Sequence, residues 1–70
     1  MELKKGRYKH YKGLYYEVLD VARHSETEEW VVVYKTLYGD FSTWVRPYDM
    51  FVSDVEVDGE MVARFEYVDK

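Results

Sequence analysis

Apolar and polar residues alternate along several short segments, which is the pattern of β-strands. In residues 30–38, Trp30, Val32 and Tyr34 fall on one side, and further valines fill the other side. Because both sides are apolar in the middle, this segment is expected to be a central strand. Residues 61–68 alternate in the same way. No segment keeps a 3.6-residue period over three turns, so the pattern predicts an all-β fold.

Glycines divide these segments at Lys12–Gly13, Gly39–Asp40 and Asp58–Gly59, and Asp-Gly is a strong hairpin signal. Residues 47–51 begin with the one proline and place two aromatic residues one turn apart, which predicts a single helical or 3₁₀ turn. We therefore expect one domain over residues 1–70. Its predicted fold is a small SH3-like barrel or roll of five to six antiparallel strands, with this turn before the last hairpin.

A chain of 70 residues buries only about 60% of its unfolded surface, so its core is thin. It contains no cysteine, which excludes disulfides, thiolate zinc sites and a cysteine nucleophile. Aromatic residues make up 19% of the chain, and 8 of them are tyrosines. A few buried aromatic rings can anchor a small core. The core cannot hold all of them, so some aromatic side chains are expected at the surface.

The sequence shows no secretory signal and no run near the roughly 20 apolar residues of a membrane helix. A chain without cysteine also suits a reducing compartment. We expect a cytoplasmic protein without membrane contact, which is a monomer or a weak homo-oligomer. We expect neither a cofactor nor a bound metal.

The net charge of −4 is unevenly distributed. Residues 1–13 hold five basic residues against one acidic residue, whereas the remaining chain is acidic. The basic residues are Lys4, Lys5, Arg7, Lys9 and Lys12. They suggest, as an alternative function, a domain that associates with nucleic acid through this segment. The acidic balance of the whole chain argues against non-specific binding of this kind.

The stretch "RHSETEE" at residues 23–29 places a histidine, a hydroxyl and several carboxylates side by side. In an extended strand, His24 and Ser25 point to opposite faces, which argues against a Ser-His catalytic pair. Ser25 and Glu28 have the spacing of a capping box, and Arg23 and Glu26 are placed to pair across a turn. The stretch is therefore interpreted as a stiff polar loop between the second and third strands.

A second alternative is a small hydrolase or metal-dependent enzyme that uses both histidines, His10 and His24. Glu26 or Asp40 would complete a zinc site. No fixed ligand spacing, nucleophile elbow or phosphate-binding glycine loop supports this alternative.

Five stretches occur in order along the chain: "GRYKHYKG", "ARHSETEE", "VVVYKTLYGD", "WVRPYDMF" and "VDGEMVARF". Together they resemble a family of small bacterial and archaeal proteins known as the domain of unknown function numbered sixteen fifty-three. The resemblance covers about Gly6 to Phe65. It implies an SH3-like β-roll and implies no activity.

The leading hypothesis is a non-enzymatic binding module that recognises a protein, a peptide or a small anionic ligand. Its surface is expected to combine the loop at residues 23–27, the turn at 38–40 and the "WVRP" segment at 44–47. The candidate residues are Tyr11, Arg23, His24, Glu26, Tyr38, Trp44 and Arg46. The charged members would make polar contacts, and the aromatic members would supply flat apolar area.

Overall fold

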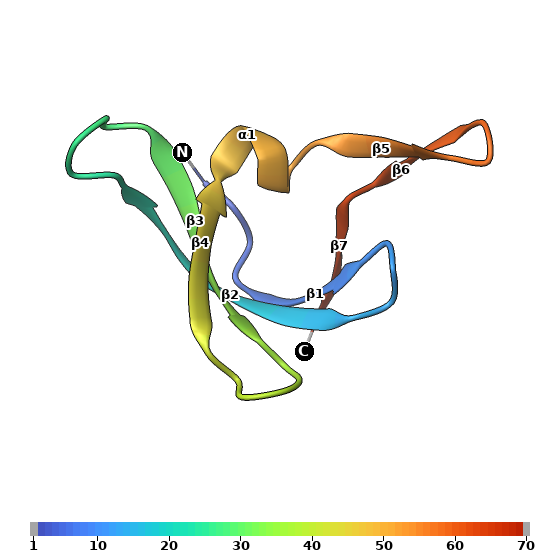
Figure 1. Ribbon diagram of the computed structural model, residues 1–70, viewed down its shortest axis with the longest axis horizontal. Coiled ribbons are helices and arrows are strands. Elements are labelled where there is room, and N and C mark those ends of the chain that lie inside the picture. The colour runs from blue at the N-terminus through green and yellow to red at the C-terminus, as the bar shows by residue number, and fades with distance from the viewer. Residues whose placement is uncertain (1, 70) are drawn as a thin grey trace.

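The computed structural model describes residues 2–69 and contains seven strands and one short helix (Figure 1). The elements are β1 (Gly6–His10), β2 (Tyr15–Arg23), β3 (Trp30–Thr36), β4 (Thr43–Pro47), α1 (Tyr48–Phe51), β5 (Asp54–Val57), β6 (Glu60–Ala63) and β7 (Phe65–Asp69). The predicted all-β fold with one helical turn near residues 47–51 is confirmed.

The main sheet has five strands in the order β4-β3-β2-β1-β7, and every neighbouring pair is antiparallel. β5 and β6 form a separate hairpin that projects from the body of the molecule (Figure 1). The register of β2 on β3 shifts between Val18 and Asp20. Such a bulge increases the local twist, which helps the sheet curl around its core.

The β5–β6 turn confirms the hairpin signal at Asp58–Gly59. Both residues have positive φ, 53° for Asp58 and 83° for Gly59. A two-residue turn with two positive φ angles follows the right-handed twist of the flanking strands. Asp-Gly suits this turn because both residue types tolerate left-handed backbone.

The strand count exceeds the expected five to six because residues 60–69 do not form one continuous strand. The chain breaks at Arg64, whose N–H donates to the Ser53 carbonyl at 3.0 Å. Its carbonyl accepts the N–H of Tyr11 at 3.0 Å. Arg64 therefore lies where the chain leaves the β5–β6 hairpin and joins the main sheet as β7.

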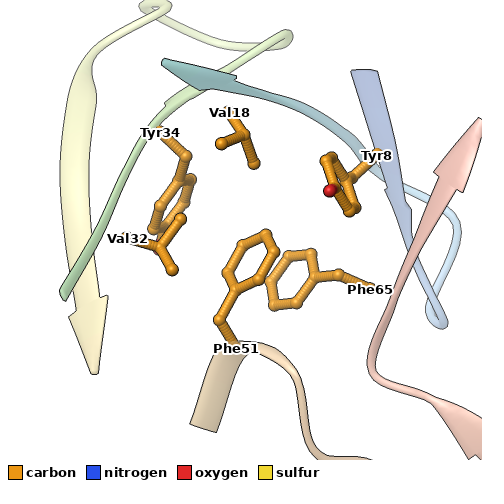
Figure 2. Close-up of a cluster of buried hydrophobic side chains, with 6 residues drawn as sticks. All are labelled: Tyr8, Val18, Val32, Tyr34, Phe51 and Phe65. Carbon is orange, nitrogen blue, oxygen red and sulfur yellow. The ribbon is translucent and has the colours of Figure 1, made fainter. Parts of the chain in front are cut away.

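The core lies on the concave face of the main sheet and is closed by α1 (Figure 2). Its buried members are Tyr8, Val18, Val32, Tyr34, Phe51 and Phe65. Phe51 from α1 and Phe65 from β7 stack with ring centroids 4.1 Å apart and planes within 5° of parallel. A chain without cysteine is thus anchored by aromatic packing, as its composition predicts.

Replacing Phe51 with alanine tests this role. Phe51 is 1% exposed, so Phe51→Ala should lower the free energy of unfolding by about 3–5 kcal/mol. A domain of this size has a total stability of about 4–10 kcal/mol, so the variant should be partly unfolded at room temperature. Urea denaturation followed by circular dichroism measures the change. The control Val52→Ala alters an exposed neighbour and should change stability by less than about 0.5 kcal/mol. Equal losses in both variants would contradict the role assigned to Phe51.

Candidate functional site

A cavity of about 290 Å³ opens on the concave face, where the β3–β4 hairpin meets the start of β2. Its lining is mainly aromatic and hydroxylated. We call it the tyrosine–arginine pocket, and it is lined by Tyr16, Tyr34, Thr36, Tyr38, Gly39, Asp40, Ser42, Trp44 and Arg46.

Strand register places these side chains on one face. Tyr34 lies opposite Trp44 across β3 and β4, and Thr36 lies opposite Tyr16 across β3 and β2. Directly paired residues of antiparallel strands share a face, so three strands contribute to one wall. Arg46 is two residues beyond Trp44 and therefore projects to the same side.

The loop between β3 and β4 holds the rim of the pocket through short-range hydrogen bonds. The indole N–H of Trp44 donates to Ser42 Oγ at 2.7 Å, which fixes the ring orientation. Asp40 Oδ1 accepts the Ser42 N–H at 3.3 Å. The backbone turns at Gly39 and Phe41, both of which have positive φ.

Arg46 carries the one guanidinium of the pocket. Its Cζ lies 5.4 Å from the ring centroid of Phe65, a cation–π distance, and one terminal N–H₂ donates to Met50 Sδ at 3.7 Å. Its Nε is buried and has no hydrogen-bond partner. The ion pairs found within residues 2–69 join other residues, so no carboxylate neutralises Arg46 there. A charged donor with only a weak sulfur acceptor is available to an incoming anion.

Tyr16 and Tyr38 join their hydroxyl groups at 2.9 Å on one side of the pocket. Burial, followed by this hydrogen bond, raises the pKa of Tyr16 to about 12. The Tyr16 phenol is therefore neutral at physiological pH. Its ring packs edge-on against Tyr34, with centroids 5.5 Å apart, so the wall is tied to the core.

His10 lies beside the pocket, and the positive charge of Arg46 affects its protonation. Its ring contacts Phe65, with centroids 4.8 Å apart, and its Nδ1 accepts the N–H of Lys12 at 3.2 Å. Burial lowers the pKa of His10 below its ordinary value of 6.5, and the charges of Arg46, Arg64 and Lys12 lower it further. Positive potential thus gathers at this end of the concave face.

A family model described as a protein of unknown function, DUF1653, matches residues 6–67. The chain belongs to the DUF1653 family. The crystal structure of a DUF1653 protein from Bordetella bronchiseptica is similar to this chain, with a TM-score of 0.89 and 36% sequence identity. The similarity covers 97% of this chain and 90% of that one. No curated protein matches the chain.

The structure brings together only part of the predicted surface of this DUF1653 protein. Tyr38, Trp44 and Arg46 line the tyrosine–arginine pocket. Tyr11 contacts His10, with ring centroids 4.6 Å apart, but lines a separate hollow against the β5–β6 hairpin. The members from the loop at residues 23–27 lie elsewhere.

Arg23, His24 and Glu26 lie at the opposite end of the β2–β3 hairpin from the pocket. The β2–β3 loop and the β3–β4 loop lie at opposite ends of β3 (Figure 1). The seven residues of β3 separate the two ends by roughly 20 Å. The loop at residues 23–27 and the turn at residues 38–40 therefore lie at opposite ends of β3 and do not line one pocket. The "WVRP" segment is part of strand β4, in which Trp44 lies toward the pocket end and Pro47 pairs with Val31, close to the end that carries loop 23–27.

Loop 24–29 is stiffened by hydrogen bonds among its own residues, and one of them joins the Glu29 N–H to Thr27 Oγ1 at 3.3 Å. His24 Nδ1 accepts the N–H groups of Glu26 and Thr27 at 3.1 and 3.3 Å, a capping task that had been assigned to Ser25. Arg23 pairs with Glu28 at 3.8 Å, not with Glu26, and stacks 4.4 Å from the Trp30 ring centroid. Each contact of His24 described here is within the loop.

The metal site built on His10 and His24 does not form. His10 ends β1 and His24 follows β2, whose nine residues span roughly 25–30 Å when extended. Within residues 2–69, no group of three histidine, aspartate or glutamate side chains could hold a metal ion. A site that couples the two histidines, with Glu26 or Asp40 as a third ligand, is excluded by this geometry.

The basic N-terminal residues do not form an isolated cationic patch. Lys5 pairs with Asp20 at 4.0 Å, and Lys4 lies over the ring of Tyr67. Arg7 and Lys9 are directly opposite Glu17 and Glu66 in the sheet. Lys12 lies over the Tyr11 ring, 5.9 Å from its centroid. The nucleic-acid alternative remains a prediction, and acidic neighbours weaken the charge on which it depends.

Sequence reasoning missed Tyr16, Tyr34, Thr36 and Ser42 as pocket residues. The alternation in residues 30–38 already placed Tyr34, Thr36 and Tyr38 on one side, which was a usable signal. Tyr16 joins them only through the pairing of β2 with β3, which no local pattern reveals.

No helix among the described residues is long and apolar enough to cross a membrane.

The lowered pKa of His10 predicts a pH dependence of stability. The unfolded chain takes up the His10 proton near pH 6.5, and the folded chain takes it up at lower pH. Between these values the unfolded state binds more protons, so stability should fall as the pH drops below about 6.5. Urea denaturation of wild type and His10→Gln from pH 7.5 to 5 measures the effect. The wild type should lose more stability than the variant over this range. Parallel curves for the two proteins would contradict the prediction.

Proposed function

We propose that this protein is a non-enzymatic binding module whose ligand presents an anionic group to Arg46. The proposal rests on the incomplete hydrogen bonding of the Arg46 side chain. Its Nε is buried without a hydrogen-bond partner, and its guanidinium borders an open cavity. A buried donor that lacks an acceptor costs roughly 1–3 kcal/mol, and an anionic ligand would recover this cost on binding.

A carboxylate or phosphate oxyanion fits this donor. The planar guanidinium presents its N–H donors in a fixed fork, which is the arrangement that binds two oxygens of one anion. Met50 Sδ is a weak acceptor, so an oxyanion would displace it with a gain in hydrogen-bond strength.

The aromatic walls would supply contact area for the rest of the ligand. Trp44 is 56% exposed and Tyr38 is 38% exposed, although both rings are held by hydrogen bonds to their neighbours. Rigid, exposed aromatic rings are typical of recognition surfaces because little side-chain entropy is lost on binding. Their position beside Arg46 supports a ligand with one charged group and one apolar or flat group.

The pocket chemistry supports binding more than catalysis. Tyr16 has a pKa of about 12, which is far from the range of a general acid or base at neutral pH. Thr36 Oγ1 already donates to the Tyr38 carbonyl at 3.1 Å, and Ser42 Oγ accepts from Trp44. Both hydroxyl groups thus have structural partners rather than a neighbouring base.

Substitution of Arg46 tests the proposal with acetate and inorganic phosphate as probes. In wild type, millimolar probe should shift the NMR signals of Trp44 Nε1–H and of Arg46. Arg46→Gln should weaken this binding about tenfold or more, and Arg46→Lys should weaken it less because charge is kept while the planar fork is lost. Lys35→Gln is the matched control. Lys35 lies in β3 between the pocket residues Tyr34 and Thr36, so its side chain points to the opposite face, and the change also removes one positive charge. Equal responses of Arg46→Gln and Lys35→Gln would overturn the proposal.

Asp40 on the pocket rim predicts a second effect. Its carboxylate repels an anion in the same cavity, whereas Asp40→Asn keeps the oxygen that accepts the Ser42 N–H. The variant should bind phosphate more tightly, by up to about fivefold, as expected for an exposed charge contribution of up to about 1 kcal/mol. NMR titration at low ionic strength measures the gain, and 0.5 M sodium chloride should reduce it. An unchanged affinity would place the anion outside this cavity.

A further inference from the structure

Strand β4 forms one edge of the main sheet, and its register reveals which backbone groups face outward. The N–H of Thr36 donates to the carbonyl of Ser42 at 3.0 Å, so this pair is a hydrogen-bonded pair of the β3–β4 ladder. Hydrogen-bonded and non-bonded pairs alternate, so Trp44 and Arg46 also direct their backbone groups toward β3. Thr43 and Val45 therefore direct their N–H and C=O groups away from the sheet.

This outward edge is open. No hydrogen bond within residues 2–69 engages the outward N–H or C=O of Thr43 or Val45. The Val45 side chain is 58% exposed. Edges of natural sheets are usually protected by a central charge, a proline or a bulge. In β4 the charge of Arg46 lies on the pocket side, the proline is the last residue, Pro47, and the ladder with β3 shows no register shift.

The open edge and the tyrosine–arginine pocket are parts of one surface. Trp44 and Arg46 belong to β4, and both side chains line the pocket. A strand added beside β4 would lie about 4.8 Å away, and alternate side chains of that strand would project over the same concave face. The pocket volume of about 290 Å³ is at the lower limit of about 300–1,000 Å³ for drug-sized ligands. It suits a single side chain better than a whole cofactor.

We propose that β4 receives an extended peptide as an additional strand, and that one acidic side chain of the peptide enters the pocket and pairs with Arg46. This inference rests on the proposed function and names the partner class for the same site. Backbone hydrogen bonds to Thr43 and Val45 provide affinity, and the acidic side chain provides specificity. Charge complementarity selects an acidic residue because Arg46 lacks a carboxylate partner within the described chain.

The first experiment uses a synthetic heptapeptide with blocked ends, alternating threonine and valine, and a central glutamate. Binding to the ¹⁵N-labelled protein is followed by NMR. The peptide should slow hydrogen exchange of the Thr43 and Val45 amides, whereas the Trp44 amide is already bonded to β3. A matched peptide with glutamine in the centre should bind about tenfold more weakly. A peptide N-methylated on the residues that pair with β4 should lose binding.

Val45→Pro is the matching change in the protein. It removes an outward N–H without removing a bond to β3, and edge strands tolerate proline at such positions. The variant should lose peptide binding, whereas its response to acetate should stay as in wild type. Met61→Thr, at an exposed residue of β6 away from this edge, should bind the peptide as wild type does. If Val45→Pro is poorly folded, the N-methylated peptide provides the same test on the wild-type chain.

The outcomes separate this inference from the function on which it rests. Acetate binding with no slowing of the Thr43 and Val45 amides would overturn strand addition and leave the anion site intact. If the glutamine peptide binds as tightly as the glutamate peptide, and Arg46→Gln binds the peptide as tightly as wild type, the acidic side chain does not determine binding. That result would overturn the pairing of the peptide with Arg46. A concentration-dependent dimer that Val45→Pro abolishes would show that a second copy of this chain binds the β4 edge. That result would overturn the proposal that the partner is a peptide.

Discussion

The stack of Phe51 on Phe65 is the contact on which the rest of the structure depends. It joins the helical turn after β4 to the first residue of β7, two parts of the chain that share no strand pairing. Tyr8 and Tyr34 pack against Phe51 from β1 and β3, with ring centroids 5.5 and 5.8 Å away. A single pair of rings thus holds the helix against both halves of the curved sheet. In a chain with no cysteine and a thin core, large rings are the available means of such closure.

The same stack couples the core to the site. Phe65 supports the Arg46 guanidinium and contacts the His10 ring. A cation held over an aromatic ring gains electrostatic attraction, but the ring accepts no conventional hydrogen bond from Nε. The fold therefore positions the guanidinium firmly and leaves part of its hydrogen-bonding capacity unused. This combination of rigid support and an unmet donor distinguishes Arg46 from Arg23, which stacks on Trp30 and also pairs with Glu28.

Local features of the structure were predictable from sequence, and features that depend on strand pairing were not. The Asp58–Gly59 turn and the helical turn after Pro47 follow from residues adjacent in the chain. Tyr38, Trp44 and Arg46 line one cavity because one hairpin carries all three. The grouping failed for Arg23, His24 and Glu26 because the length of β3, and not residue chemistry, decides which turn faces which end. The break at Arg64 was also invisible, since it depends on hydrogen bonds to Ser53 and Tyr11.

The β5–β6 hairpin is held to the body of the molecule at both of its ends, which has a consequence for protein engineering. The aromatic stack and the bond from the Arg64 N–H to the Ser53 carbonyl fix the two points where the hairpin leaves the body. The buried core cluster contains no residue from β5 or β6, and the exposed turn at residues 58–59 projects away from it. Lengthening a loop whose ends are already fixed costs little free energy, because the closure entropy grows only with the logarithm of its length. This turn is therefore a permissive position for inserting an affinity tag, a fluorophore attachment site or a small guest domain.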